Sequence, residues 1–210
     1  MPHYVVVEGE GDARAVPNLL SRVGHQLGLY AVWKPPLRIN VQRPSDAQKV
    51  ADLTRGRADA QGLLVLRDDE DGCPRDDGPE IASWFQALSL PFPVACVLFY
   101  REYETIFLPV IEDLAGRPLT VAGVERRGLN ADAAFSGDPE SRRDAKGVLT
   151  ANMPPGRSYK ETTDQLAMTQ LVDIPRLLAS GLPCVETLER ALRFLLTPGA
   201  GAGRVFPLDR

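Results

Sequence analysis

The chain is poor in the side chains that build several common kinds of site. Its 210 residues include three cysteines, Cys73, Cys96 and Cys184, and two histidines, His3 and His25. No CxxC pair occurs, so neither a disulfide framework nor a zinc knuckle is indicated, and dispersed thiols suit a reducing cytoplasm. The two histidines exclude a His-rich zinc or iron site and leave no convincing Ser-His-Asp or Cys-His catalytic set.

Long apolar runs and an excess of basic charge are missing as well. The longest apolar run, near residues 91–100, is too short to span a bilayer, and the N-terminus shows no signal-peptide pattern. We therefore expect a cytoplasmic protein that does not associate with membranes. The net charge of −4 argues against a protein that coats nucleic acid, although it leaves room for a local basic groove.

What is present is an alternation of apolar strands with helices. Strands are predicted at 3–8, 37–41, 62–67 and 93–100, and helices at 12–27, 46–58, 79–89 and 101–114. The clearest strands are apolar throughout, which is typical of a parallel sheet flanked by helices, so the predicted fold class is α/β. From Asp138 onward only helices are predicted, at about 139–152, 161–180 and 183–196.

The same pattern predicts how the chain is organised into parts. An α/β core covers residues 1–125, and a mostly helical C-terminal part over 126–196 packs on this core. Residues 197–210 show no periodic pattern and are expected to form a loose tail. A chain of this length suits one large domain or one domain with an appendage.

The stretch YVVVEGEGDAR, residues 4–14, joins an apolar strand to a helix through two glycines. A dinucleotide-binding loop reads G-x-G-x-x-G, and here the third glycine is missing, while a P-loop is excluded because no GxxxxGK[ST] occurs. Glu8, Glu10 and Asp12 would repel a pyrophosphate. The helix dipole accounts for Glu10 and Asp12 but not for Glu8, because a carboxylate at the end of an apolar strand needs a compensating positive charge. The ligand that fits is a cation.

A second acidic stretch, LRDDED, follows the strand at 62–67. Sites in open parallel α/β sheets form outside the carboxyl ends of the strands, so Glu8 and Asp68 meet if their strands are neighbours. Glu102 or Glu104 joins them if the strand at 93–100 belongs to the same sheet. Oxygen ligands suit Mg²⁺ or Mn²⁺, and carboxylate-bound Mg²⁺ pairs serve phosphoryl chemistry. The alternatives are a solvated acidic loop and a solvated first helical turn.

These motifs resemble those of the Toprim domain, the metal-dependent catalytic module of topoisomerases, primases and the overcoming-lysogenization-defect nucleases. VVVEGEGDA matches a first-strand motif of the type VEGxxDA and gives the role of its glutamate to Glu8. VLRDDEDG is similar to the Asp-x-Asp motif of a later strand. If the motif is aligned by its position at the strand end, it corresponds to Asp68-x-Glu70. If it is aligned by residue identity, it corresponds to Asp69-x-Asp71, and both assignments stay open.

The whole chain also resembles an uncharacterised bacterial family of Toprim-like proteins of unknown function. The resemblance extends over most of residues 4–195 and rests on VEGEGDARAVPNLL, LLVLRDDEDGCP, REYETIFL and RDAKGVLTANMPPGRSYKETTDQLAMT. Two departures are Ile106-Phe107, where a tryptophan-phenylalanine pair is expected, and Gly72, where another acid is common. The resemblance implies a Toprim-like, Rossmann-like sheet with a helical C-terminal extension, and nuclease chemistry in phage defence beside an ATPase partner.

The predicted function is therefore a Mg²⁺- or Mn²⁺-dependent phosphodiesterase that acts on nucleic acid, either DNA or RNA. The predicted catalytic residues are Glu8, Asp68 and Glu70. The predicted metal ligands come from Glu8, Asp68, Asp69, Glu70, Asp71 and Glu104, with Glu10, Asp12 and Glu102 as further candidates. The predicted phosphate contacts come from a basic segment and are Arg142, Arg143, Lys146, Arg157 and Lys160.

Three points stay open at the level of the sequence. The basic segment is either a substrate surface, with Tyr159 stacking on a base or sugar, or a solvated helix face and loop. An alternative function is a non-catalytic Toprim-like interaction or regulatory subunit of an ATPase-containing complex, which the acidic charge and the imperfect Asp-x-Asp motif favour. A nucleotide-binding enzyme of Rossmann type ranks third. The oligomeric state is undetermined, with a homodimer as one option.

Overall fold

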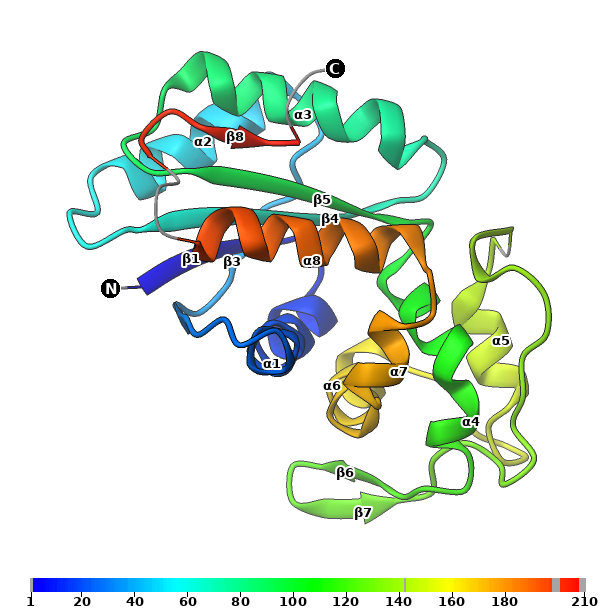
Figure 1. Ribbon diagram of the computed structural model, residues 1–210. Coiled ribbons are helices and arrows are strands. Elements are labelled where there is room, and N and C mark those ends of the chain that lie inside the picture. The colour runs from blue at the N-terminus through cyan, green and yellow to red at the C-terminus, as the bar shows by residue number, and fades with distance from the viewer. Residues whose placement is uncertain (1, 142, 198–200, 208–210) are drawn as a thin grey trace.

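The computed structural model describes residues 2–141, 143–197 and 201–207, and Arg142 lies outside the described residues. A parallel sheet lies between two layers of helices (Figure 1). Its strands, in order across the sheet, are β2 (Val32–Trp33), β1 (Pro2–Val7), β4 (Gly62–Asp69), β5 (Val94–Tyr100) and β8 (Val205–Phe206), and β3 (Leu37–Arg38) also pairs with β1. All these pairings are parallel, which confirms the predicted α/β class and makes the architecture Rossmann-like.

Helices and one small hairpin complete the described part of the fold. In the first half of the chain the helices are α1 (Glu10–Gln26), α2 (Pro44–Arg55), α3 (Pro74–Leu88), the 3₁₀ helix η1 (Tyr103–Val110) and α4 (Ile111–Leu114). An antiparallel hairpin follows, made of β6 (Leu119–Val121) and β7 (Val124–Arg126). The second half contains the 3₁₀ helix η2 (Pro139–Ser141), α5 (Ala145–Ala151), α6 (Glu161–Leu171), α7 (Ile174–Leu178) and α8 (Pro183–Leu196).

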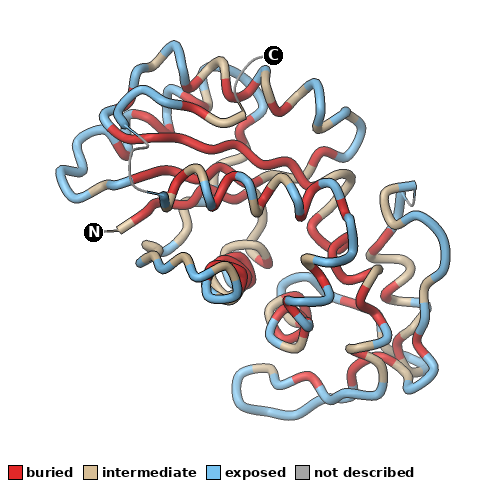
Figure 2. Tube along the Cα trace, viewed as in Figure 1, coloured by how far each residue is buried: buried red, intermediate tan, exposed pale blue. Residues whose placement is uncertain are grey.

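The two faces of the sheet are covered by different helices because strand side chains alternate between the faces. Val5 and Leu64 belong to a buried cluster that contains the apolar stripe of α1 and the inner face of α8. Val6 and Leu63 point the other way, into a cluster with α2 and α3. Figure 2 shows the strands as the most continuously buried part of the chain.

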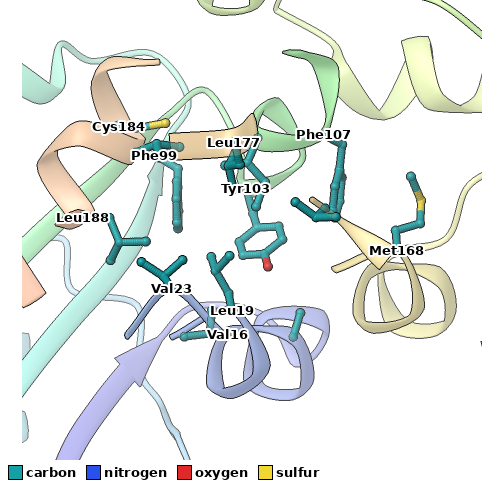
Figure 3. Close-up of a cluster of buried hydrophobic side chains, with 14 of the residues drawn as sticks. Val16, Leu19, Val23, Phe99, Tyr103, Phe107, Met168, Leu177, Cys184 and Leu188 are labelled. Atoms are coloured by element: carbon teal, nitrogen blue, oxygen red, sulfur yellow. The ribbon is translucent and has the colours of Figure 1, made fainter. Parts of the chain in front are cut away.

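The α1 side of the core extends beyond the sheet. Leu19 of α1 and Leu188 of α8 lie in the same buried cluster as Tyr103 and Phe107 of η1 and Met168 of α6 (Figure 3). The C-terminal helices therefore share one hydrophobic core with the first helix. This shared core fixes the segment after β5 against the carboxyl edge of the sheet.

Several predicted helices have different boundaries in the structure. The predicted helix at 101–114 is wrong in part, because Arg101 has a φ of 71° and the chain then forms η1, with Pro109 inside it. A proline lacks the backbone N–H that an α-helix needs at that point. The predicted helix at 161–180 is two helices, since Asp173 caps a new start before Pro175. The predicted helix at 139–152 is divided into the 3₁₀ helix η2 and the helix α5, which Asp144 caps.

Some strands were not predicted at all. No strand was expected after Asp138 and residues 197–210 were expected to be loose, yet β8 pairs with β5 and Val205 is buried. A two-residue strand offers no alternation to detect, so only its pairing with the open edge of β5 reveals it. Residues 198–200 and 208–210 of this tail lie outside the described residues. Within the described chain, no helix has the length and apolar character needed to cross a membrane.

Candidate functional site

The topology brings three acidic segments to one edge of the sheet. β1 pairs with β4 and β4 pairs with β5, so the strands that carry Glu8 and Asp68 at their ends are neighbours, as was considered from the sequence. Glu8 directly follows β1, Asp68 lies near the end of β4, and Glu104 lies in η1 just after β5. Because the carboxyl ends of parallel strands share an edge, these side chains approach one another.

The segment after β1 places two carboxylates in defined positions. Asn40 donates a hydrogen bond of 2.5 Å from Nδ2 to Oε1 of Glu8. Asp12 accepts hydrogen bonds from the backbone N–H of Gly9 at 2.9 Å and from Nε2 of Gln165 at 2.8 Å. Burial raises the pKa of the Glu8 carboxyl, and the nearby negative charge of Asp12 raises it further. The turn therefore holds negative charge at the edge of the sheet, as the sequence predicted.

Asp68 shares the electrostatic field of these groups. Burial raises its pKa well above the ordinary value for an aspartate, and repulsion from Asp12, Glu104 and Glu8 adds to this shift. The positive charge of Lys146 opposes it. The acids thus lie close enough to disfavour one another's ionisation, which like charges do at short range.

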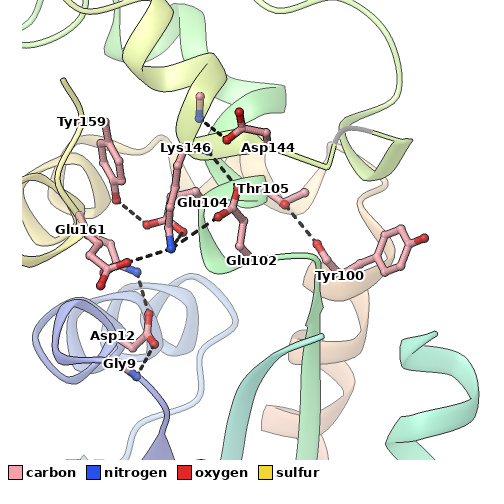
Figure 4. A network of polar contacts seen from close by, with 12 residues as sticks. Gly9, Asp12, Tyr100, Glu102, Glu104, Thr105, Asp144, Lys146, Tyr159 and Glu161 are labelled. Atoms are coloured by element: carbon pink, nitrogen blue, oxygen red, sulfur yellow. Dashed lines mark hydrogen bonds and ion pairs between the residues drawn. The ribbon is translucent and has the colours of Figure 1, made fainter. Parts of the chain in front are cut away.

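The ammonium group of Lys146 lies among three carboxylates, two from the start of η1 and one from the start of α6 (Figure 4). Its Nζ is 2.8 Å from Oε2 of Glu161, 3.5 Å from Oε2 of Glu102 and 3.8 Å from Oε2 of Glu104. The backbone N–H of Lys146 also donates to Oε1 of Glu102, at 2.9 Å. Burial disfavours the charge on Lys146, but the surrounding glutamates outweigh burial and raise its pKa. We use the name carboxylate cluster for Glu8, Asp12, Asp68, Glu102, Glu104 and Glu161.

Glu104 is the buried centre of this arrangement. Its side chain is 1% exposed, and the Tyr159 hydroxyl donates a hydrogen bond of 2.7 Å to its Oε1. Burial raises the pKa of Glu104 to about 7, against the opposing effects of Lys146 and of this hydrogen bond. Tyr159 is itself buried, so its ring is not available to stack on a base or sugar, and that part of the sequence interpretation is wrong.

The end of β4 forms a second acidic pair beside the cluster. Asp69 is 2% exposed and accepts a hydrogen bond of 3.2 Å from Nη2 of Arg67, while in the described chain its Oδ2 has no hydrogen-bond partner. Burial and the nearby carboxyl of Asp77 raise the pKa of Asp69. A side chain at Gly72 would lie 1.9 Å from Oδ2 of Asp77, which explains why a glycine follows the acids.

A cavity of ≈ 320 Å³ opens beside these residues. Its walls include Glu8, Arg67, Asp68, Asp69, Glu70 and Asp77. The cavity therefore joins the predicted catalytic residues Glu8, Asp68 and Glu70 in one concave surface. Such a surface, with convergent polar groups and shifted pKa values, is the usual form of a binding site.

Other predicted site residues lie apart from the cluster. Glu10 is paired with Arg14 at 2.5 Å on the exposed side of α1. Asp71 is exposed and lies 3.5 Å from Arg143, although it also lines the cavity beside Glu8. Arg157 is paired at 2.6 Å with Asp164, which is buried. Lys160 is exposed.

Several residues at the site were not identified from the sequence. They are Asn40, Arg67, Asp77, Glu161 and Gln165. A charged residue at the end of the apolar run GLLVLR was a usable signal for Arg67, because a partly buried arginine needs partners. Asn40 and Gln165 gave no such signal, since their partners lie 32 and 153 residues away along the chain.

The class of this protein follows from its geometry, because comparisons with known proteins add nothing to it. The chain is a Rossmann-like α/β protein with an acidic site at the carboxyl edge of its sheet. No family model, no curated protein and no solved structure matches it. Over residues 2–141, 143–197 and 201–207, no three His, Cys, Asp or Glu side chains are arranged as a ready-made metal shell.

Proposed function

We propose that this chain is a Toprim-like, Mg²⁺-dependent phosphodiesterase that cleaves nucleic acid. The observation that carries the proposal is the convergence of Glu8, Asp68 and Glu104, which lie at or just after the carboxyl ends of the adjacent parallel strands β1, β4 and β5. Their mutual repulsion favours a bound cation, because a positive charge lowers the free energy of ionised carboxylates held close together.

The side chains present fit a hard divalent cation. All the acidic donors are oxygens, which Mg²⁺ and Mn²⁺ prefer, and the partnerless Oδ2 of Asp69 is a buried oxygen that lacks a donor in the described chain. Glu8, Asp68 and Glu70 would hold the ion, with Asp69 beside them. When bound, Mg²⁺ would polarise a phosphoryl oxygen and lower the pKa of a water molecule.

The chain's own groups supply charge balance and a proton site. Lys146 offsets the negative charge of Glu102, Glu104 and Glu161, which would otherwise repel a phosphodiester. Glu104, with a pKa of about 7, can hold or release a proton near neutral pH, which is the property required of a general acid or base. The hydroxyl of Tyr159 fixes the orientation of the Glu104 carboxyl.

A cleavage assay on the purified full chain tests the proposal. We expect Mg²⁺ or Mn²⁺ to support cleavage of DNA or RNA, and Glu8→Gln and Asp68→Asn to reduce the rate by about 100-fold or more, which is typical of losing a metal-activating group. Glu10→Gln removes one carboxylate from the same turn but outside the cluster, so it should keep the wild-type rate.

Metal binding provides a second readout that does not depend on turnover. Mg²⁺ should raise the melting temperature of the wild type and of Glu10→Gln, and should leave Glu8→Gln and Asp68→Asn almost unchanged, because only the native cluster binds the ion. Wild-type cleavage rates in both cluster variants would contradict the proposed site.

A second candidate function is favoured by one observation, the position of Lys146. Its ammonium already neutralises part of the cluster, so the site is compatible with a structural role in a non-catalytic, Toprim-like regulatory subunit. Under this alternative the chain would bind an ATPase in a phage-defence complex. Metal-independent association with such an ATPase, together with no cleavage by the purified chain, would favour this alternative over the phosphodiesterase.

A further inference from the structure

The basic segment that was predicted to contact phosphates uses much of its charge inside the protein. Lys146 is held by three glutamates, Arg157 is paired with the buried Asp164, and Arg143 lies near Asp71. A cation held in a buried pair gains little from a phosphate, because the existing pair has to be broken first. Among the described residues the segment therefore offers only the exposed Arg143 and Lys160, and a nucleic-acid substrate needs a further cationic surface.

The hairpin β6–β7 offers one. Arg126 and Arg127 are exposed, and no hydrogen bond or ion pair of their side chains occurs among the described residues. They line a cavity of ≈ 500 Å³ whose walls also include Glu125, Pro154 and Pro155. Glu125 is the single acidic residue in these walls as far as the described residues show, so the lining has a net positive charge. Figure 2 shows the hairpin as a largely exposed projection.

The strand register tells which way Arg126 points. Arg126 lies directly opposite Leu119, and opposite residues of an antiparallel pair project from the same face. Leu119 is buried in the core, so this face of the hairpin is the one that turns toward the body of the protein. Thr120 and Glu125 lie opposite each other on the other face.

The hairpin has a tight turn at one end and a closely packed, hydrogen-bonded base at the other. Its turn places Ala122 and Gly123 at φ values of 50° and 79°, the conformation of a tight two-residue connection. At its base a side chain at Gly128 would lie 2.2 Å from the carbonyl oxygen of Arg117, so the chain passes closely there. Asn130 ties this base to α5 and the residues after it through bonds to the carbonyl groups of Asn152 and Met153. A preorganised surface loses little entropy when it binds a ligand.

The loop that forms one wall of the cavity leads directly to the carboxylate cluster. Pro154 and Pro155 line the cavity, and Tyr159 of the same loop donates its hydroxyl hydrogen to Glu104. Strand β6 also packs on helix α6, whose Glu161 contacts Lys146. The hairpin and the site are thus connected through this loop and through α6, which lies next to the hairpin in Figure 1.

We propose that Arg126 and Arg127 of the hairpin, with the adjoining cavity, bind the phosphodiester backbone of the nucleic acid that reaches the carboxylate cluster. This inference rests on the proposed function for the nature of the substrate. No aromatic side chain lines the cavity among the described residues, so recognition is through backbone phosphates rather than stacked bases. Binding is then independent of sequence and sensitive to salt.

The test is a fluorescence-anisotropy titration of labelled DNA and RNA oligonucleotides in EDTA, where binding is measured without metal-dependent cleavage. We expect Arg126→Ala/Arg127→Ala to weaken binding by about 10-fold or more at low salt, and to reduce the slope of log affinity against log salt by about 1.5 to 2, the value for two lost phosphate contacts. The matched control is Lys49→Ala/Arg190→Ala, which removes two exposed cations from α2 and α8. It should keep the wild-type slope.

Each outcome decides the inference. Equal affinities and slopes for the two double variants, or no binding by the wild type, overturn it. Inorganic phosphate and unlabelled oligonucleotide are also compared as competitors at equal concentrations of phosphate groups. If inorganic phosphate displaces the labelled oligonucleotide equally well, the cavity is a site for small anions and the inference is overturned. Binding that depends on the hairpin arginines supports the inference even if no cleavage follows when Mg²⁺ is added. The absence of cleavage would contradict only the proposed phosphodiesterase function.

Discussion

At the residue scale, the protonation of Glu104 depends on the fold around it. The side chain has a tyrosine hydroxyl on one oxygen and the Lys146 ammonium 3.8 Å from the other, yet burial dominates and raises its pKa from 4.5 to about 7. A glutamate in an unfolded chain loses its proton near pH 4.5. The folded protein therefore retains a proton on Glu104 that the unfolded chain releases.

This difference predicts a pH-dependent stability with a definite sign. Since the folded-state pKa of Glu104 is raised, the free energy of unfolding should fall as pH rises from about 4.5 to about 7, by roughly 3 kcal/mol from this group. Glu104→Gln has no proton to lose and should show a flatter profile in urea unfolding measured from pH 4.5 to 8. Glu112→Gln, a change at an exposed glutamate, should follow the wild-type profile. Parallel profiles for all three proteins would refute the assignment.

At the element scale, the two glycines of VEGEGDA have separate roles. Gly9 is the N-cap of α1 in an extended conformation, and Gly11 lies in the first turn of the helix. A side chain at Gly11 would lie 1.9 Å from Oε1 of Gln165 and 3.0 Å from the carbonyl oxygen of Glu161. Gly11 therefore allows α6 to approach α1, and this approach brings Gln165 to Asp12.

Substitution at this contact should cost stability. We expect Gly11→Ala to lower the free energy of unfolding by about 1 to 2 kcal/mol, because overpacking outweighs the gain in helix propensity. Gly56→Ala is the matched control, since a side chain there meets no atom within 4 Å. It should change the stability by less than about 1 kcal/mol. Denaturant unfolding measures both, and a Gly11→Ala variant as stable as Gly56→Ala would disprove the close approach.

At the scale of the whole molecule, one core links the two ends of the chain. Helix α8 lies on the same face of the sheet as α1, and Leu192 of α8 is completely buried in the cluster that contains Leu19 of α1. β8 then returns the chain to the open edge of β5. The described part of the C-terminal region therefore belongs to the same packed unit as the first strand.

Shared packing predicts cooperative unfolding. Leu192→Ala should lower the free energy of unfolding by about 2 to 5 kcal/mol, as expected for a cavity at a buried leucine, and calorimetry should still record a single transition. The same truncation at Leu53, which is 46% exposed on α2, should cost much less. Two separate transitions in the wild type, with only one shifted by Leu192→Ala, would show that α8 folds independently.

The sequence by itself determined the main strands, the α/β class and the acids at the strand ends. These features are local: a run such as YVVV or GLLVLR is buried wherever the chain folds, and an acid that follows it lies at the carboxyl edge of a parallel sheet. This is why Glu8 and Asp68 could be placed in one neighbourhood. The residues between strands carried less information, as the short strands β2 and β8 and the 3₁₀ helix η1 demonstrate.

Only the tertiary structure decided which charges compensate one another. Lys146 reaches Glu102 across 44 residues of chain and Tyr159 reaches Glu104 across 55, distances at which no periodicity in the sequence relates two side chains. The same is true of the exposed Arg126, whose direction follows from its register with a buried leucine. The energy of a charge depends on its burial and on its neighbours in space, and both are properties of the packed fold.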